Sequence, residues 1–121
     1  MLANDERAEL MKRIAAAFGA TLIATAASAA NGANDFLLAA KPNVQAATLA
    51  KAVGANCQGQ TAFYMGIGKS GISQGKGFWS VRCSDGRPFL VQVNSDGTSS
   101  VLECAVLKRL NAGTCFKALS D

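Results

Sequence analysis

The stretch GIGKSGISQGKG, residues 66–77, is the first whose residue types and spacing could do chemistry. It holds five glycines, two lysines and no acid. Such a loop binds a phosphate when its backbone N–H groups converge on the anion and a helix begins directly after it. Here the chain continues into GFWSVRC, which is typical of a strand, and Phe63 stands where a P-loop needs its first glycine. We interpret residues 66–77 as a flexible hairpin connection. The alternative is a weak anion site formed by backbone N–H groups with Lys69 and Lys76.

Catalytic groups are scarce in this sequence. It contains no histidine, so neither a Ser–His nor a Cys–His pair can form and the commonest metal ligand is missing. Asp85 and Asp96 occupy turn positions that already account for them, and no two carboxylates are evident as a pair for glycoside hydrolysis. We therefore predict that the protein is not an enzyme and holds neither a cofactor nor a metal. Arg82 and Arg87 flank a turn and could contact an anion or a partner; the alternative is an ordinary solvated pair.

Four cysteines, Cys57, Cys83, Cys104 and Cys115, occur without any C-x-x-C motif. This spacing is unlike a zinc ribbon or a redox motif, and in an exported protein it predicts two structural disulfides. We prefer the pairs Cys57–Cys83 and Cys104–Cys115. The pairs Cys57–Cys115 and Cys83–Cys104 stay open, because spacing alone cannot separate the connectivities. A thiol-active enzyme would instead need an exposed, reactive Cys83 or Cys104.

The N-terminal region has the layout of a secretory signal. From Met11 the chain reads MKRIAAAFGATLIATAASAA, with two basic residues, an uncharged run and the small-residue triplet at 27–29. We expect residues 1–29 to be removed by cleavage after Ala29. The alternative is a retained membrane anchor, because the 17 residues of 14–30 reach about the lower limit for a span. Three acids in residues 1–10 are unusual for a signal, so we expect translation to start at Met11.

Export predicts a periplasmic or secreted protein with no stable membrane span after signal cleavage. Beyond residue 29 the chain has nine basic and five acidic side chains, which are scattered along the sequence. A nucleic-acid binder more often gathers its basic residues on one face or in one tract, so we expect no nucleic-acid partner. The length allows one small domain, which we place at 43–121 after a flexible lead-in at 30–42.

Hydrophobic periodicity and turn residues predict an α+β fold. Asn43 can cap a helix over residues 44–53 that ends at Gly54. Four runs rich in β-branched and aromatic residues then predict strands, followed by a short helix. The strands are expected at 61–67, 77–83, 87–93 and 98–104, and the last helix at 105–111. The architecture expected is an N-terminal helix packed on a four-stranded antiparallel β-meander, with a short C-terminal helix and two disulfides.

Two Ser-Asp-Gly tripeptides, at 84–86 and 95–97, predict the strand register. A three-residue hairpin loop places a glycine with positive φ at its last position. These loops put Val81 opposite Phe89, Trp79 opposite Val91, and Val91 opposite Val101. One face of the sheet is then mainly apolar and is expected to lie under the helix, whereas the other is more polar. The apolar face consists of Trp79, Val81, Phe89, Val91, Val93 and Val101, and the polar one includes Ser80, Arg82 and Gln92.

The segment FWSVRCSDGRPFLVQVNSDGTSSVLEC and the later CF resemble small secreted proteobacterial proteins of no assigned function, in which W-x-V-x-C-x-x-G precedes a strand ending in cysteine. The order of a helix and then a β-meander, over residues 44–116, also resembles the PepSY type of module. That resemblance implies regulation of proteases or a place in envelope assemblies, and no catalytic residue carries over. We expect a non-enzymatic periplasmic binding or accessory module that docks on a protein partner in the envelope. The alternatives are a thiol-active enzyme and a structural envelope protein.

Overall fold

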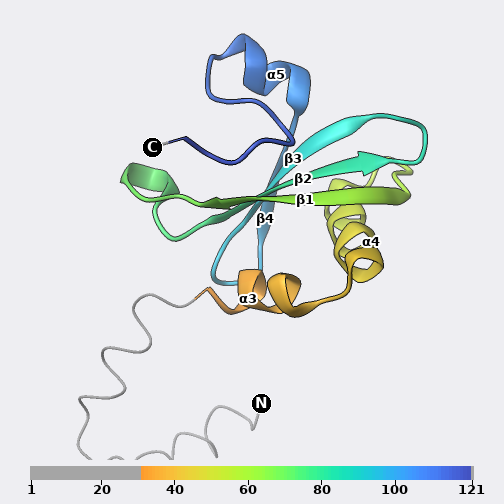
Figure 1. Ribbon diagram of the computed structural model, residues 1–121, viewed down its shortest axis with the longest axis horizontal. Helices are drawn as coiled ribbons and strands as arrows, with labels where there is room; N and C mark the ends of the chain where they lie inside the picture. Colours follow the sequence, from red (N-terminus) through yellow and green to blue (C-terminus); the bar gives the residue numbers. More distant parts are fainter. Residues whose placement is uncertain (1–30, 121) are drawn as a thin grey trace, which may run out of the picture. The chain divides into compact units, whose positions relative to one another are not determined.

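The computed structural model describes residues 31–120; the predicted signal segment 1–29 and the expected start at Met11 lie outside the described residues. Figure 1 shows the helices of the described residues on both sides of a single sheet. In chain order the elements are α3 (Gly32–Ala39), α4 (Pro42–Val53), β1 (Gly59–Ile67), the short 3-10 helix η1 (Gly71–Ser73), β2 (Gly77–Cys83), β3 (Pro88–Val93), β4 (Ser99–Glu103) and α5 (Cys104–Arg109).

The sheet is an antiparallel meander with the strand order β1-β2-β3-β4. The predicted register is confirmed, because Val81 pairs with Phe89, and Val91 pairs with both Trp79 and Val101. Gly86 and Gly97 end the two three-residue loops with φ values of 94° and 90°, a region that side chains disfavour. The predicted fold class is therefore confirmed, and the loop glycines account for its register.

The helix α4 begins two residues earlier than the sequence suggests. Its N-cap is Lys41, which makes no side-chain capping bond, and Pro42 starts the helix instead of an Asn43 cap. Proline is well suited to this position because its fixed φ is helical and its missing N–H would have no partner there. The helix ends at Gly54, with φ 69°, as expected from the sequence.

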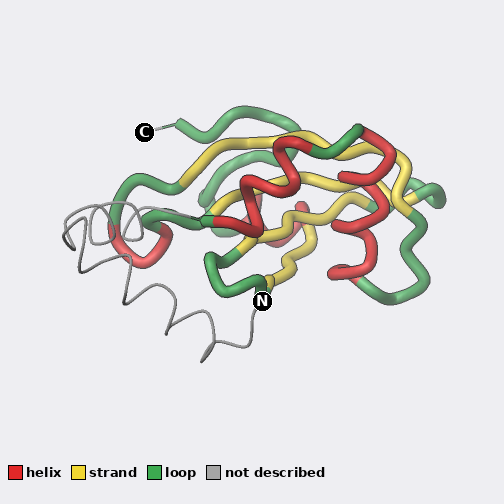
Figure 2. Tube along the Cα trace, turned by 90° about the horizontal axis from the view of Figure 1, so that it is seen from below, coloured by secondary structure: helices red, strands yellow, loops and turns green. Residues whose placement is uncertain are grey.

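Helices α3 and α4 cover the first face of the sheet, which carries the main hydrophobic core. Figure 2, seen from the side of these helices, shows them lying across the strands. The buried side chains of this core are Leu37, Leu49, Trp79, Val81, Cys83, Phe89, Val91 and Val93. Val101, expected in the same core, is 38% exposed. It shares the face but lies on the last strand of the sheet, so only one side of it has a neighbouring strand.

Residues 32–39 form the helix α3, where an irregular lead-in was expected. Polar side chains attach this helix to the sheet. The Asn31 side chain caps the helix by accepting from the N–H of Asn34 (3.0 Å) and donates to the carbonyl of Val93 (3.0 Å). The buried Asn34 side chain accepts from the Trp79 indole (2.7 Å) and donates to the Tyr64 hydroxyl (3.2 Å). Apolar periodicity could not reveal this helix because asparagines hold it to the sheet.

The second face of the sheet carries a smaller core, although the sequence suggests a more polar surface. Met65, Leu90 and Leu107 are buried there, with Phe78, Leu102, Cys115 and Leu119 packed against them. Leu107 belongs to α5, and the last residues belong to the segment that follows it. The helix and this C-terminal segment therefore cover part of the second face.

Candidate functional site

The disulfides join Cys57 to Cys83 and Cys104 to Cys115, which confirms the preferred pairing. The first joins the α4–β1 connection to the end of β2, and Cys83 is fully buried. The second ties the start of α5 to the C-terminal segment. All four cysteines are thus bonded, and the thiol considered from the sequence is not present in this structure.

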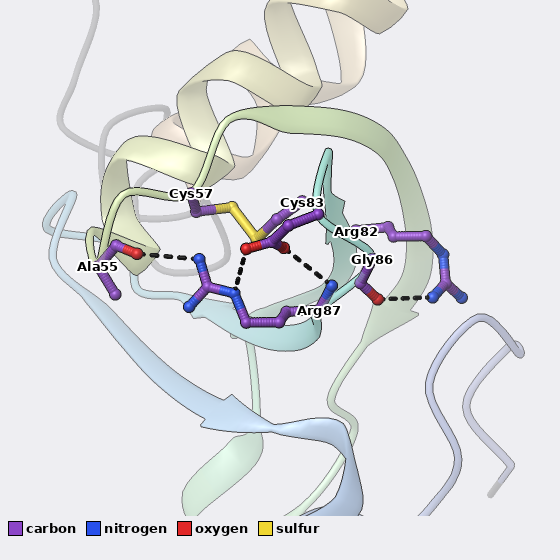
Figure 3. Close-up of polar contacts among 7 residues, drawn as sticks. Ala55, Cys57, Arg82, Cys83, Gly86 and Arg87 are labelled. Carbon is purple, nitrogen blue, oxygen red and sulfur yellow. Dashed lines mark hydrogen bonds and ion pairs between the residues drawn. A yellow bond between two sulfur atoms is a disulfide. The ribbon is translucent and has the colours of Figure 1, made fainter.

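Arg87 is engaged in contacts within and beside the β2–β3 turn. Its Nε donates to Asp85 Oδ2 at 2.7 Å and its guanidinium donates to the carbonyl of Ala55 at 2.9 Å (Figure 3). The backbone N–H of Arg87 donates to Asp85 Oδ1 and, with the guanidinium, holds the pKa of Asp85 below its usual value. The guanidinium also lies 5.6 Å from the ring centre of Phe89, a residue of the first-face core.

Arg82 points to the other side of the same turn. It donates to the carbonyl of Gly86 at 3.2 Å (Figure 3), and its guanidinium lies 4.7 Å from the ring centre of Phe116 in the C-terminal segment. The two arginines therefore contact groups on opposite faces of the sheet. The structure does not bring them together into one anion-binding patch.

The glycine-rich loop is closed by its own backbone. The N–H of Gly68 donates to Lys76 O, that of Gly75 to Gly68 O, and that of Lys76 to Ser73 O, at 2.9 to 3.0 Å. At Gly68 the loop approaches itself so closely that an added Cβ would lie 2.1 Å from Ser73 O. These three N–H groups bond within the loop instead of converging on a ligand. Only the three-residue η1 follows, so a helix-based phosphate cradle is not formed.

A pocket of about 560 Å³ opens between this loop and the second face. Its floor is apolar and comes from the strands, α5 and the C-terminal segment, whereas its polar lining comes mainly from the loop. The apolar lining is Met65, Ile67, Phe78, Leu90, Leu107, Ala112 and Leu119; the polar side chains are Lys69, Ser70, Ser73 and Ser120. Of the four cationic residues singled out from the sequence, Lys69 lines this pocket.

The C-terminal segment forms one wall of this pocket and is held at several points. The disulfide fixes Cys115, the N–H of Phe116 donates to Ser80 Oγ at 2.9 Å, and the N–H of Leu119 donates to Met65 O at 2.9 Å. The last bond places the segment along β1. Sequence analysis missed the pocket because the segment reaches the sheet through contacts distant in the chain, and its leucines show no strand or helix period.

The two edges of the sheet differ. The C-terminal segment lies beside the outer edge of β1. The pairing of β1 with β2 is also irregular, with register shifts between Gly59 and Thr61 and between Tyr64 and Gly66. Strand β4 pairs regularly with β3, and none of the described residues pairs with its outer edge. Its sequence SSVLE has no proline or lysine, which are common protections of an exposed edge, and its one charged residue, Glu103, lies at its end.

The backbone groups at this open edge can be assigned. The carbonyl of Thr98 accepts from the N–H of Asn94 at 2.9 Å, which makes these residues a hydrogen-bonded pair. Such pairs alternate along an antiparallel ladder, so the N–H and C=O groups of Ser99 and Val101 point away from β3, as does the N–H of Glu103, whose carbonyl caps the start of α5. Their side chains share the first face with the core. The open edge therefore offers backbone partners beside an exposed apolar side chain.

A groove of about 450 Å³ adjoins the β3–β4 end of the first face, between the sheet and the helices α3 and α4. Its walls include Leu37, Leu49, Val91 and Val93, and Phe36, which is 61% exposed, lies at its border. Lys51 is its only charged lining residue. Ser99 of β4 also lines the groove, which therefore lies next to the open edge.

Comparisons with protein-family models, curated proteins and solved structures match nothing to this chain. Within residues 31–120, no three histidine, cysteine or acidic side chains lie together as a metal site would require. The same part of the chain contains no helix with the length and hydropathy of a membrane span. Function is therefore argued from the surfaces themselves.

Proposed function

We propose that this chain is an exported, non-enzymatic binding module that serves as an accessory subunit in the cell envelope. It acts by adding an extended segment of a partner protein to the outer edge of β4. The two disulfides support a place outside the cytoplasm, because such bonds persist in oxidising compartments. The observation that carries the proposal is the open edge of β4 beside an apolar groove.

Strand addition fits this edge in both hydrogen bonding and shape. An added strand would pair its backbone with Ser99 and Val101, and its alternate side chains would lie on the first face next to the groove. The outer edge of β4 is regular and contains neither proline nor lysine, and such an edge readily pairs with a strand of another chain. Because Lys51 is the charged residue of the groove, the partner segment should carry an acidic residue next to its alternating apolar ones.

The test begins by finding the partner at the edge. A photo-cross-linking residue replaces Ser99, which lines the groove, and a second variant carries it at Ser84, in the turn at the opposite end of the sheet. After irradiation of intact cells, mass spectrometry identifies the linked segment. We expect Ser99, and not Ser84, to link to one extended segment with alternating apolar residues. Absence of a protein linked from Ser99 contradicts the proposal.

The purified partner then allows a backbone test. Val101→Pro removes an N–H that points outward and leaves the β3–β4 ladder intact, whereas Val101→Thr keeps both the N–H and the shape. Loss of one hydrogen bond, about 0.5–1.5 kcal/mol, together with the ring at the edge should weaken binding about tenfold or more. The threonine variant should bind within about threefold of the parent. Equal affinities for the proline variant and the parent would exclude strand addition.

A further inference from the structure

We propose that the pocket on the second face binds an anionic amphiphile, that is, a single alkyl chain with a carboxylate or phosphate head group. The chain would lie on the apolar floor and the head group would lie at the glycine-rich loop. This site differs from the edge of β4, because Leu90 alternates along β3 with Phe89 and Val91 and so faces away from the main core. The proposal does not depend on strand addition.

The size and division of the pocket indicate this ligand. Its volume of about 560 Å³ lies within the range of roughly 300–1,000 Å³ that small-molecule sites occupy. Buried Met65, Leu90 and Leu107 supply the floor, where an alkyl chain gains from leaving water. Lys69, Ser70 and Ser73 all come from one loop, so the cationic and hydroxyl groups gather at one end of the pocket.

Charge around the pocket points to an anion. The segments 66–77 and 104–121, which supply the loop, α5 and the C-terminal wall, contain five basic residues and one acid, Asp121. The basic residues are Lys69, Lys76, Lys108, Arg109 and Lys117. The neighbouring Glu103 pairs with Phe89 and therefore belongs to the first face, and Asp121 lies outside the described residues. Lys69 lines the pocket, and the net positive charge of the segments that form it favours an anionic ligand over a cationic one.

A head group would interact with side chains rather than with a backbone cradle. The N–H groups of Gly68, Gly75 and Lys76 bond within the loop, so the polar lining at this end consists of the side chains of Lys69, Ser70 and Ser73. The Ser73 hydroxyl donates its only proton to Ser70 O at 2.9 Å, so of the two hydroxyls it is that of Ser70 that can donate to a head group. This arrangement suits one head group better than a row of phosphates, and the apolar floor accounts for the rest of the ligand.

The test is an amide NMR titration of the oxidised protein with sodium octanoate, decanoate and dodecanoate below their micelle concentrations. We expect shifts around Met65, Gly68, Leu90 and Leu107, with affinity rising up to about fourfold per added methylene until the floor is covered. Dodecanol has the chain without the charge, and inorganic phosphate has the charge without the chain. Both should bind more weakly than dodecanoate. Equal binding of dodecanol, or equal binding of phosphate alone, overturns the proposal.

Two variants and one control locate the site. Ala112→Phe fills the pocket from an exposed position and should abolish the shifts, whereas Ala52→Phe, an exposed residue of the first-face groove, should leave them unchanged. Lys69→Gln should weaken dodecanoate about two- to fivefold, as expected for an exposed ion pair, and leave dodecanol unchanged. The spectra themselves report whether each variant is folded.

Anionic vesicles form the last arm, because a lipid surface presents the same chemistry. If the protein binds monomeric dodecanoate and binds phosphatidylglycerol vesicles no more tightly, the pocket holds a single amphiphile, as proposed. Binding to vesicles without any shift from the monomer shows a surface interaction and overturns the proposal. An unchanged dodecanoate affinity in Ala112→Phe also overturns it.

Discussion

The buried amide of Asn34 should be the most sensitive polar position in the protein. Asn34→Ala removes the acceptor 2.7 Å from the Trp79 indole nitrogen, in a place where both side chains are about 1% exposed. Water cannot easily replace that acceptor, so the indole N–H is left without a partner, at a cost of about 1–3 kcal/mol. For a domain of this size the melting temperature should fall by about 5–20 °C.

A double-mutant cycle separates this hydrogen bond from the loss of packing. Trp79→Phe removes the N–H, so in the double variant no donor is left unsatisfied and the combined cost should be smaller than the sum. We expect a coupling energy of about 1–2 kcal/mol in chemical denaturation followed by circular dichroism. A cost below about 0.5 kcal/mol for Asn34→Ala, or a coupling energy of zero, would show that α3 is not held to the sheet by this bond.

Three further predictions concern the covalent bridge, a close approach and a turn. Replacing Cys104 and Cys115 by serine opens a loop with a separation of 11 residues; the oxidised parent should be more stable by about 2.8 kcal/mol in urea denaturation, and an equal midpoint would contradict this. Gly77→Ala places a Cβ 2.1 Å from the buried amide of α3 and should cost about 1–3 kcal/mol, whereas Gly32→Ala, where nothing lies within 4 Å, should not destabilise. Because the pKa of Asp85 is lowered in the folded state, its contribution to the free energy of unfolding is present above the usual aspartate pKa of about 3.9. That contribution is lost as the pH falls through the folded-state pKa. Asp85→Asn should therefore flatten the fall of melting temperature at acid pH, and identical slopes would refute that role.

The hairpins could be predicted because their information is local. Each Ser-Asp-Gly fixes a loop length and a glycine with positive φ, and the alternation of Trp79, Val81, Phe89 and Val91 then determines which face is buried. The preferred disulfide pairing is confirmed, although spacing alone did not separate it from Cys57–Cys115 with Cys83–Cys104. Propensity and spacing were sufficient for the hairpins.

The parts that the sequence did not predict depend on distant contacts. The helix α3 is held by Asn31 and Asn34, whose hydrogen bonds reach Val93 and Trp79 far along the chain. Likewise, the second face looks polar in the strand pattern until α5 and the C-terminal segment add Leu107 and Leu119 to it. The pocket exists only in that assembly, so no short motif could have revealed it.

An open pocket next to buried leucines needs a reason to stay open in so small a domain. Exposed apolar surface favours collapse, and Phe78 and Leu119 at its walls would gain from closer packing. The C-terminal wall is restrained by the Cys104–Cys115 bond, by Phe116 N–H bonded to Ser80 and by Leu119 N–H bonded to Met65. These attachments hold the wall to the start of α5 and to the sheet at fixed points. The restraints that stabilise a domain with a small core therefore also keep the pocket open. An alkyl chain can then bind without first reorganising the protein.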